Sequence, residues 1–248
     1  MKRRRLELPG RAKPYVMAHR GSSAIAPENT LASFRRAIAD GADILETDLH
    51  LTRDGTFVCI HDGTLDRTAG VPGVVAEMTL AELKQVPIPC GRLEPQFLAE
   101  RVPTLAELAE ILPAHVSIAL ELKTDRFLEP SVASELSRSL AQWGVADRTV
   151  VISFHLERVL AVKRADPDLP GGFITANRWA PNVPVELIGP YWPLLIANPF
   201  YTWWAHRRGM LVAPLDAASD RRLWLYRLLG CDAILTDDPA ATRRLLGR

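Results

Sequence analysis

Short apolar runs alternate with amphipathic stretches along most of the chain of 248 residues. Runs such as 15–18 and 149–153 are typical of buried strands, whereas 29–39 and 156–165 repeat their apolar residues with helical spacing. The predicted strands are 15–18, 44–51, 56–60, 116–122, 149–153, 172–175, 194–197, 210–213 and 233–236. The predicted helices are 29–39, 80–86, 105–112, 132–143, 156–165, 183–188, 202–208, 221–229 and 240–246.

Strands that alternate with helices predict a parallel sheet covered by helices. Roughly eight strand–helix units in a chain of this length favour a (β/α)₈ TIM barrel, and we expect residues 1–248 to form one such domain. An open doubly wound sheet is disfavoured, because no glycine-rich phosphate loop follows the first strand. Residues 62–102 alternate less clearly and are rich in Gly and Pro, so we interpret them as a small insertion after the second barrel strand.

Composition excludes several classes of function. The formal net charge is +1, which gives no general attraction to nucleic acid or to an anionic membrane. The apolar stretch 191–204 is too short and too broken by proline to cross a membrane, and the basic start, Met1 to Arg5, lacks the apolar run of a signal peptide. The three cysteines, Cys59, Cys90 and Cys231, have no metal-type spacing, so we expect reduced thiols and a cytoplasmic location.

Polar residues follow the ends of several predicted strands. His19 and Arg20 follow the first strand, and His61 follows the third. Two pairs stand two residues apart, which places both members on one face of a strand: Glu46 with Asp48, and Glu121 with Lys123. In a TIM barrel the carboxyl ends of the strands meet at one mouth, so these side chains would converge there.

The chemistry of this set favours phosphoryl transfer. Three carboxylates repel one another unless a cation sits among them, and oxygen-only ligands favour Ca²⁺ or Mg²⁺, with Mn²⁺ as an alternative. Arg20 and Lys123 would supply positive charge for an anion such as phosphate. His19 and His61 would act as general acid and base.

Each residue also has a plainer interpretation. A Glu-x-Asp pair is more often a solvated strand face or an ion pair, although apolar neighbours on both sides of Glu46 and Asp48 favour burial. Glu28 and Asn29 either support the site or cap the first helix. Phe154 and His155 either line the pocket or begin a helix. Three further histidines, His50, His115 and His206, are assigned structural roles, and Cys59 is assigned to the core.

Several short motifs, in this order, resemble those of the glycerophosphodiester phosphodiesterase family, a group of phosphatidylinositol-phosphodiesterase-like TIM barrels. The likeness runs from about Tyr15 to Pro239. The matching stretches are His19-Arg20-Gly21, Pro27-Glu28-Asn29-Thr30, Glu46-Thr47-Asp48, Asp54-Gly55, His61-Asp62-Gly63-Thr64-Leu65-Asp66-Arg67-Thr68, Val102-Pro103-Thr104-Leu105, Glu121-Leu122-Lys123, Ser153-Phe154 and Thr236-Asp237-Asp238-Pro239.

The resemblance implies a barrel with a small insertion and a divalent ion on Glu46, Asp48 and Glu121. It also implies a phosphate held by the ion, Arg20 and Lys123, with His19 and His61 as the acid/base pair. In the mechanism that it implies, a glycerol hydroxyl attacks phosphorus, the alcohol leaves, and water opens the cyclic phosphate. The sequence departs from the family at 211–216, where Ala213 stands in place of a Trp and Asp216 stands near an Asn.

We therefore expect metal-dependent hydrolysis of a small-molecule glycerophosphodiester to glycerol 3-phosphate and an alcohol, with no nucleic-acid partner and no stable membrane insertion. One alternative is lysophospholipase D-type hydrolysis, in which aromatic residues around 191–204 accept an acyl chain rather than simply filling the core. A second is a catalytically silent barrel that only binds phosphodiesters. A third, a metal-dependent sugar isomerase or aldolase, fits the Glu121–Lys123 pair less well. The alcohol, the metal and the oligomeric state are left open.

Overall fold

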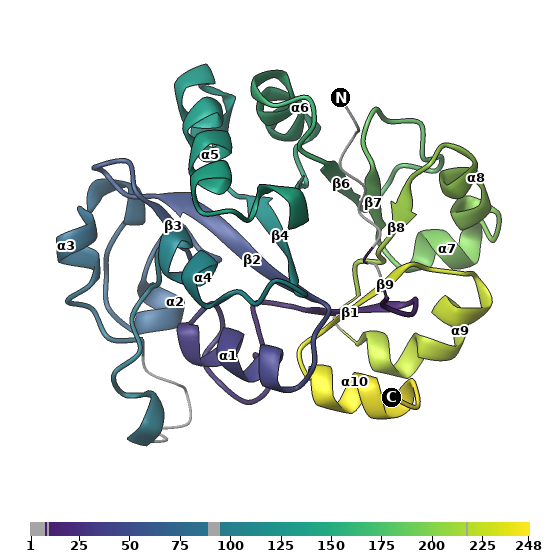
Figure 1. Cartoon of the computed structure of the whole chain (residues 1–248), viewed down its shortest axis with the longest axis horizontal. Helices are drawn as coiled ribbons and strands as arrows, with labels where there is room; N and C mark the ends of the chain where they lie inside the picture. Colours follow the sequence, from purple (N-terminus) through teal and green to yellow (C-terminus); the bar gives the residue numbers. More distant parts are fainter. Residues whose placement is uncertain (1–7, 9, 89–94, 217) are drawn as a thin grey trace.

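Parallel strands form the centre of the fold in a computed structural model that describes residues 8, 10–88, 95–216 and 218–248 (Figure 1). Within this part of the chain, eight parallel strands pair in the order β8-β7-β6-β5-β4-β2-β1-β9, and β3 pairs with β2 outside this path. The strands are β1 (Tyr15–Ala18), β2 (Ile44–Leu51), β3 (Phe57–Cys59), β4 (Ser117–Leu122), β5 (Thr149–Ser153), β6 (Gly171–Thr175), β7 (Leu187–Pro190), β8 (Leu211–Val212) and β9 (Ala233–Thr236).

Helices follow the strands and cover the outside of the sheet (Figure 1). They are α1 (Leu31–Ala39), α2 (Asp66–Ala69), α3 (Leu80–Leu83), α4 (Leu105–Ile111), α5 (Pro130–Gln142), α6 (Leu156–Ala165), α7 (Pro193–Ala197), α8 (Tyr201–Arg207), α9 (Leu223–Leu228) and α10 (Pro239–Leu245). Short 3₁₀ helices are η1 (Val75–Glu77), η2 (Pro95–Phe97), η3 (Asp125–Leu128), η4 (Ala146–Arg148) and η5 (Ser219–Arg222). The predicted (β/α)₈ barrel is confirmed.

The barrel is nearly closed, and its seam lies between β8 and β9. The Asp232 amide donates to the Val212 carbonyl at 2.8 Å, and the Val212 amide donates to Asp232 Oδ2 at 2.8 Å. A buried side chain thus replaces part of the strand pairing at the seam. Lys13 Nζ and His206 Nε2 lie 2.7 Å from the two oxygens of this carboxylate. Partners on both oxygens meet the requirement that a buried charge be paired.

Alternate residues of each strand face two different apolar clusters. Met17 and Ile152 belong to a cluster built of strand residues in the barrel interior, whereas Ala18 and Val151 pack with the surrounding helices. This alternation is what sends Glu46 and Asp48 into the barrel while Leu45 packs outward.

Residues between β3 and α4 carry a third apolar cluster that includes Leu65, Val75 and Leu83. The turn at Arg53–Gly55 joins β2 to the antiparallel strand β3. Helix α2 was not predicted, since four residues are too few to show helical periodicity. The interpretation of residues 62–102 as an insertion stays a prediction, and residues 89–94, with Cys90, lie outside the described residues.

Two neighbouring predictions were wrong in type. The predicted helix at 183–188 is a non-helical segment whose bends at 183–186 lead into β7, and the predicted strand at 194–197 lies within α7. Val183 and Val185 are both buried and alternate with Pro184 and Glu186, which is a strand period rather than a helical one. Pro193 occupies the first turn of α7, where its fixed φ and missing N–H favour a helix start.

No helix in the described ranges is long and apolar enough to cross a membrane. Cys59 and Cys231 are buried free thiols, and burial raises the pKa of each to about 12. Their burial agrees with the core role predicted for Cys59. The cytoplasmic location expected from the cysteine content stays a prediction.

Candidate active site

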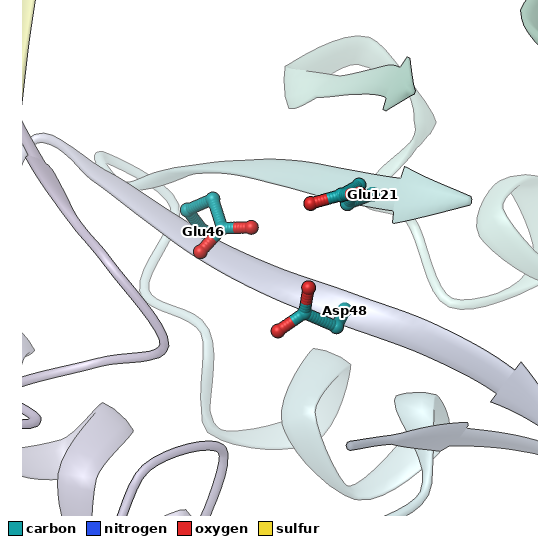
Figure 2. A group of neighbouring side chains, drawn as sticks. All are labelled: Glu46, Asp48 and Glu121. Atoms are coloured by element: carbon teal, nitrogen blue, oxygen red, sulfur yellow. The ribbon is translucent and has the colours of Figure 1, made fainter. Parts of the chain in front are cut away.

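Three buried carboxylates meet inside the barrel. Glu46 and Asp48 lie on β2 and face Glu121 on β4, as Figure 2 shows. Each of the three offers an oxygen, and these atoms lie within 4.8 Å of one another. The register of the two strands explains the meeting, because Asp48 is directly opposite Glu121 and Glu46 is directly opposite Ala119. The sequence-based expectation that these residues converge is confirmed.

The acidic cluster carries more negative charge than the protein neutralises. Burial and the charge of Asp48 raise the pKa of Glu46 to about 8. Burial also raises the pKa of Glu121, although Lys123 opposes the shift. Buried carboxylates that lie close together resist ionisation, because their negative charges repel one another. A cation among their oxygens stabilises the ionised form. The donor set is oxygen only, which suits a hard divalent ion.

Arg20 stands between the first strand and the acidic cluster. Its backbone amide donates to Glu46 Oε2 at 3.0 Å, and its guanidinium Nη1 donates to Glu28 Oε1 at 2.9 Å. Its Nε lies 3.3 Å from Asp48 Oδ2 but without hydrogen-bond geometry, so this buried donor has no hydrogen-bond partner in the structure. An unsatisfied buried N–H is costly and is a natural contact for a ligand oxygen.

The backbone at Arg20 and Gly21 turns sharply away from the strand. Both residues have positive φ angles, 55° and 85°. A Cβ atom on Gly21 would lie 2.4 Å from Ser33 Oγ and 2.7 Å from the Ser33 carbonyl carbon. Glycine is therefore required at this position by conformation and by space. The turn leaves the Arg20 amide facing Glu46.

Asn29 supports the acidic cluster through hydrogen bonds to residues of β2. It is buried, its Nδ2 donates to Asp48 Oδ2 at 2.9 Å, and its Oδ1 accepts from Thr47 Oγ1 at 2.6 Å. Asn29 does not cap the first helix. The N-cap of α1 is Thr30, which forms a capping box with Ser33.

His19 is paired with a carboxylate at the end of the last strand. Its Nδ1 lies 2.7 Å from Asp237 Oδ1, which leaves Nε2 as the nitrogen free for a reacting atom. Burial lowers the pKa of His19, but the hydrogen bond to Asp237 and the charge of Glu46 outweigh this effect, so the pKa is raised. Asp237 also accepts a hydrogen bond from Ser23 Oγ at 3.0 Å.

His61 forms a similar pair on the other side of the acidic cluster. Its Nδ1 lies 2.6 Å from Asp62 Oδ1, and Lys123 Nζ lies 3.1 Å from its Nε2. Since an ammonium group can only donate, this contact places the imidazole proton on Nδ1 and a lone pair on Nε2. Lys123 Nζ also lies 3.1 Å from Glu121 Oε1 and 3.5 Å from Asp48 Oδ1. Lys123 therefore joins His61 to the acidic cluster.

A bridge of alternating charges connects the two sides. Arg67 donates to Asp62 and makes two bonds to Glu28, at 2.9 and 2.7 Å. Glu28 in turn accepts from Arg20. Burial alone would raise the pKa of Glu28, but the hydrogen bond from Arg67 and the charge of Arg20 lower it overall. Glu28 thus remains ionised and holds both arginines in place.

Two cavities adjoin His19. One of about 460 Å³ is lined by His19, Arg20 and Asp237 together with residues of the β8–α9 connection. A smaller one of about 50 Å³ lies beside His19, Glu46 and Glu121 and is otherwise apolar. Ala213 lines the smaller cavity. A further cavity of about 330 Å³ near Arg11 and Arg148 contains none of the predicted site residues.

Some candidates lie outside the cluster. Phe154 and His155 are exposed at the end of β5 and line neither cavity, and the His155 side chain makes no capping bond although it stands at the N-cap of α6. His50 Nε2 lies 3.2 Å from the His61 carbonyl, His206 pairs with Asp232, and His115 is exposed near Arg148. None of the three belongs to the cluster, and the structural roles assigned to them stay predictions.

Sequence reasoning did not assign roles to Asp62, Arg67 and Asp237. The signal was present, since Asp62 follows His61 directly and Asp237 follows the last strand. What the sequence could not show was that each carboxylate would face an imidazole Nδ1, because that depends on rotamers and on the closure of the barrel.

Comparison with known proteins places this arrangement in a family. A model described as the glycerophosphoryl diester phosphodiesterase family matches residues 19–241. A glycerophosphodiester phosphodiesterase from Caldanaerobacter subterraneus is 32% identical over 236 residues, covering 92% of this chain and 95% of that protein.

Solved structures share the fold. A phosphodiesterase from Oleispira antarctica, in complex with the product sn-glycerol-3-phosphate, is 26% identical with a TM-score of 0.83, covering 95% of this chain and 97% of that one. A glycerophosphodiester phosphodiesterase from Agrobacterium tumefaciens has the same fold at 24% identity and a TM-score of 0.78, covering 91% of this chain and 97% of that one.

Proposed function

This chain belongs to the glycerophosphoryl diester phosphodiesterase family, and on that premise we propose that it hydrolyses glycerophosphodiesters to glycerol 3-phosphate and an alcohol. The observation that carries the proposal is the meeting of two His–Asp pairs, two cationic side chains and three buried carboxylates at one end of the barrel. Acid–base groups on either side of an anion site are what cleavage of a phosphodiester requires.

Glu46, Asp48 and Glu121 would hold a divalent cation, Ca²⁺ or Mg²⁺, with Mn²⁺ as an alternative. When bound, the ion supplies positive charge that stabilises the phosphoryl oxygens. Asn29 would fix Asp48 for this task through its 2.9 Å hydrogen bond. The excess negative charge of the cluster supports this assignment.

Arg20 and Lys123 would bind the phosphoryl group. The unpartnered Nε of Arg20 is a donor for one of its oxygens, and Lys123 Nζ lies between Glu121 and His61. Glu28 would hold Arg20 in place, and Arg67 would hold Asp62 in place. Because Glu28 and Arg67 also bond to each other, the distance between Arg20 and His61 would stay fixed.

His19 and His61 would transfer the protons at Nε2. In the first step a glycerol hydroxyl bonds to phosphorus as the alcohol–phosphorus bond breaks. One imidazole takes the hydroxyl proton and the other gives a proton to the leaving oxygen. Water then opens the cyclic phosphate with the two roles reversed, which yields glycerol 3-phosphate. Asp237 and Asp62 would keep each ring in the tautomer and orientation that this exchange needs.

The test is glycerol 3-phosphate release from glycerophosphocholine and glycerophosphoethanolamine with Ca²⁺, Mg²⁺ or Mn²⁺. We expect His19→Ala and His61→Ala each to lower kcat by about 10²- to 10⁴-fold, because a general acid or base contributes about that much. His115→Ala is the matched control, since His115 is exposed near Arg148 and away from the cluster. Full activity in either folded variant, or activity that survives excess chelator, would contradict the assignment.

A second candidate substrate class is the lysophospholipids. The apolar cavity beside His19 and the exposed Tyr191 and Phe200 favour it, since an acyl chain needs apolar contacts. Turnover of lysophosphatidylcholine relative to glycerophosphocholine separates the two classes. Binding of glycerol 3-phosphate without turnover of either diester would instead identify a silent phosphodiester-binding barrel.

A further inference from the structure

Large apolar side chains lie exposed along one side of the barrel mouth. Trp179, Tyr191, Ile196, Phe200 and Trp203, which we call the apolar rim, are between 41% and 67% exposed. They follow the carboxyl ends of β6 and β7 or begin α8, so they lie at the end of the barrel that carries the candidate active site. In Figure 1, α7 and α8 lie next to each other at the opposite side of the molecule from α2 and α3.

Hydrogen bonds tie together the segments that carry the apolar rim. Asn198 Nδ2 donates to the Trp179 carbonyl at 3.0 Å, which ties the loop after β6 to the connection between α7 and α8. The Leu194 amide donates to the Tyr191 carbonyl at 2.9 Å, which fixes the Tyr191 backbone at the start of α7. The backbone of the rim is therefore anchored to the barrel through these bonds.

Core packing does not account for the apolar rim. Helices α7 and α8 already bury Leu195, Tyr201 and Ala205 on their inner face. A helix on the surface of a water-soluble domain normally carries polar side chains on its other face. Residues 187–205 contain no Asp, Glu, Lys, Arg or His, so the outer face carries no charged side chain before His206 and Arg207 in the last turn of α8. Exposed apolar side chains with so few charges among them indicate a partner.

The chemistry of the apolar rim fits a lipid surface. Trp and Tyr favour the boundary between headgroups and hydrocarbon, because each has an apolar body and a polar tip. Cations flank the rim: Arg207 stacks over the Trp203 ring at 5.5 Å, and Arg178 lies in the loop after β6. The sole acidic residue in 176–205 is Glu186, which is paired with Lys163 at 2.8 Å. Nothing in this segment would repel anionic headgroups.

We propose that the apolar rim rests reversibly on a phospholipid bilayer surface, with its aromatic side chains at headgroup depth and the barrel mouth turned towards the lipid. The orientation follows from position, since the rim and the candidate active site share one end of the barrel. This contact would give the active site access to diesters derived from membrane lipids, and that role rests on the proposed function. The contact itself does not, because it involves none of the residues assigned to catalysis or metal binding.

Vesicle binding tests the contact separately from catalysis. The full chain carrying His61→Ala, with chelator present, is sedimented with vesicles of phosphatidylcholine alone or with one-third phosphatidylglycerol. We expect binding to both, stronger to the anionic vesicles, and a loss of about tenfold or more when Ile196→Ser and Phe200→Ser are combined, because two buried side chains are removed. Lack of vesicle binding by the parent protein would overturn the proposal.

The matched control is Leu228→Ser with Leu245→Ser. These leucines are 75% and 55% exposed but end α9 and α10, at the other end of the barrel. We expect the control to bind vesicles as the parent does, and both double variants to keep the parent's thermal unfolding. Equal loss in both double variants would indicate non-specific adsorption and contradict the proposal. A concentration-dependent dimer that only the Ile196/Phe200 variant disrupts, without vesicle binding, would assign the rim to a second copy of the chain instead.

Discussion

Asn29 combines a left-handed backbone with a side chain that holds Asp48. Its φ is 55°, and its amide bridges Thr47 and Asp48. Asn29→Gly removes the side chain while keeping the backbone conformation accessible. We expect calorimetry to show Ca²⁺ binding weakened about 10- to 100-fold, the usual effect of losing a partner that orients a ligand. Unchanged affinity would mean that Arg20 and Lys123 suffice to hold Asp48.

Substitutions at Gly21 and Gly55 distinguish the cost of steric crowding from the cost of backbone strain. Both have positive φ, 85° and 83°, but an added Cβ meets Ser33 only at Gly21 and nothing within 4 Å at Gly55. We expect Gly55→Ala to lower the free energy of unfolding by about 1 kcal/mol, from the φ cost alone. Gly21→Ala should lower it by about 3 kcal/mol or more, because steric overlap is added. Urea denaturation measures both, and equal losses would contradict the crowding argument.

Helix α4 begins with a capping box that is also an ion pair. Glu107 Oε2 accepts from the Thr104 amide at 2.7 Å and lies 2.5 Å from Lys84 Nζ. Burial raises the pKa of Glu107, but the hydrogen bond from Lys84 and the Thr104 amide outweigh it and lower the pKa overall. A carboxyl whose pKa is lowered by folding stabilises the fold at neutral pH and loses that effect as pH falls through its folded pKa.

Glu107→Ala should therefore destabilise the protein by about 1 kcal/mol at pH 7, mostly through the cap, since the half-exposed ion pair is screened. The difference from the parent should shrink as the pH falls below the ordinary Glu pKa of about 4.3 and on through the lower pKa of folded Glu107, because the parent then loses its carboxylate charge. Urea unfolding at neutral and at acidic pH checks this. A difference that stays constant with pH would show that the charge of Glu107 has no part in the cap.

Elements with clear periodicity could be predicted from the sequence, and those defined by their neighbours could not. Strands β1, β2 and β5 have the predicted bounds, because β1 and β5 are short, largely apolar runs and β2 begins and ends with apolar residues. The segment 183–197 was assigned the wrong types, since its strand is specified by pairing with β6 and β8 and its helix by Pro193. The acidic cluster could be predicted, because spacing on a strand decides which face a side chain takes.

The bridge from Asp62 through Arg67 and Glu28 to Arg20 lay beyond sequence reasoning. Its members are separated by up to 47 positions and meet only because two loops fold over the same barrel end. Long charged side chains have many rotamers, so their partners follow from the folded geometry rather than from spacing.

For the molecule as a whole, divalent ions should couple to stability. The three buried carboxylates repel one another, and an ion that binds only the folded state adds to its free energy of unfolding. At about 100 times the dissociation constant we expect Ca²⁺ to raise Tm by about 5–10 °C. Glu46→Gln should lose this gain, whereas Glu186→Gln, which alters a carboxylate paired with Lys163, should keep it. Calorimetric scans with and without chelator measure the shift, and an unchanged Tm in the parent would contradict the coupling.

The seven residues proposed for chemistry all lie between His19 and Lys123, whereas the apolar rim lies between Trp179 and Trp203 (Figure 1). On both proposals, the first half of the chain supplies these seven residues and the second half supplies the apolar rim, together with Asp237, which pairs with His19. Such a division lends itself to recombination. Consider a chimera that keeps residues up to 123 and the last strand but takes 124–230 from a relative. It would take its catalytic residues from one parent and its lipid-contacting surface from the other.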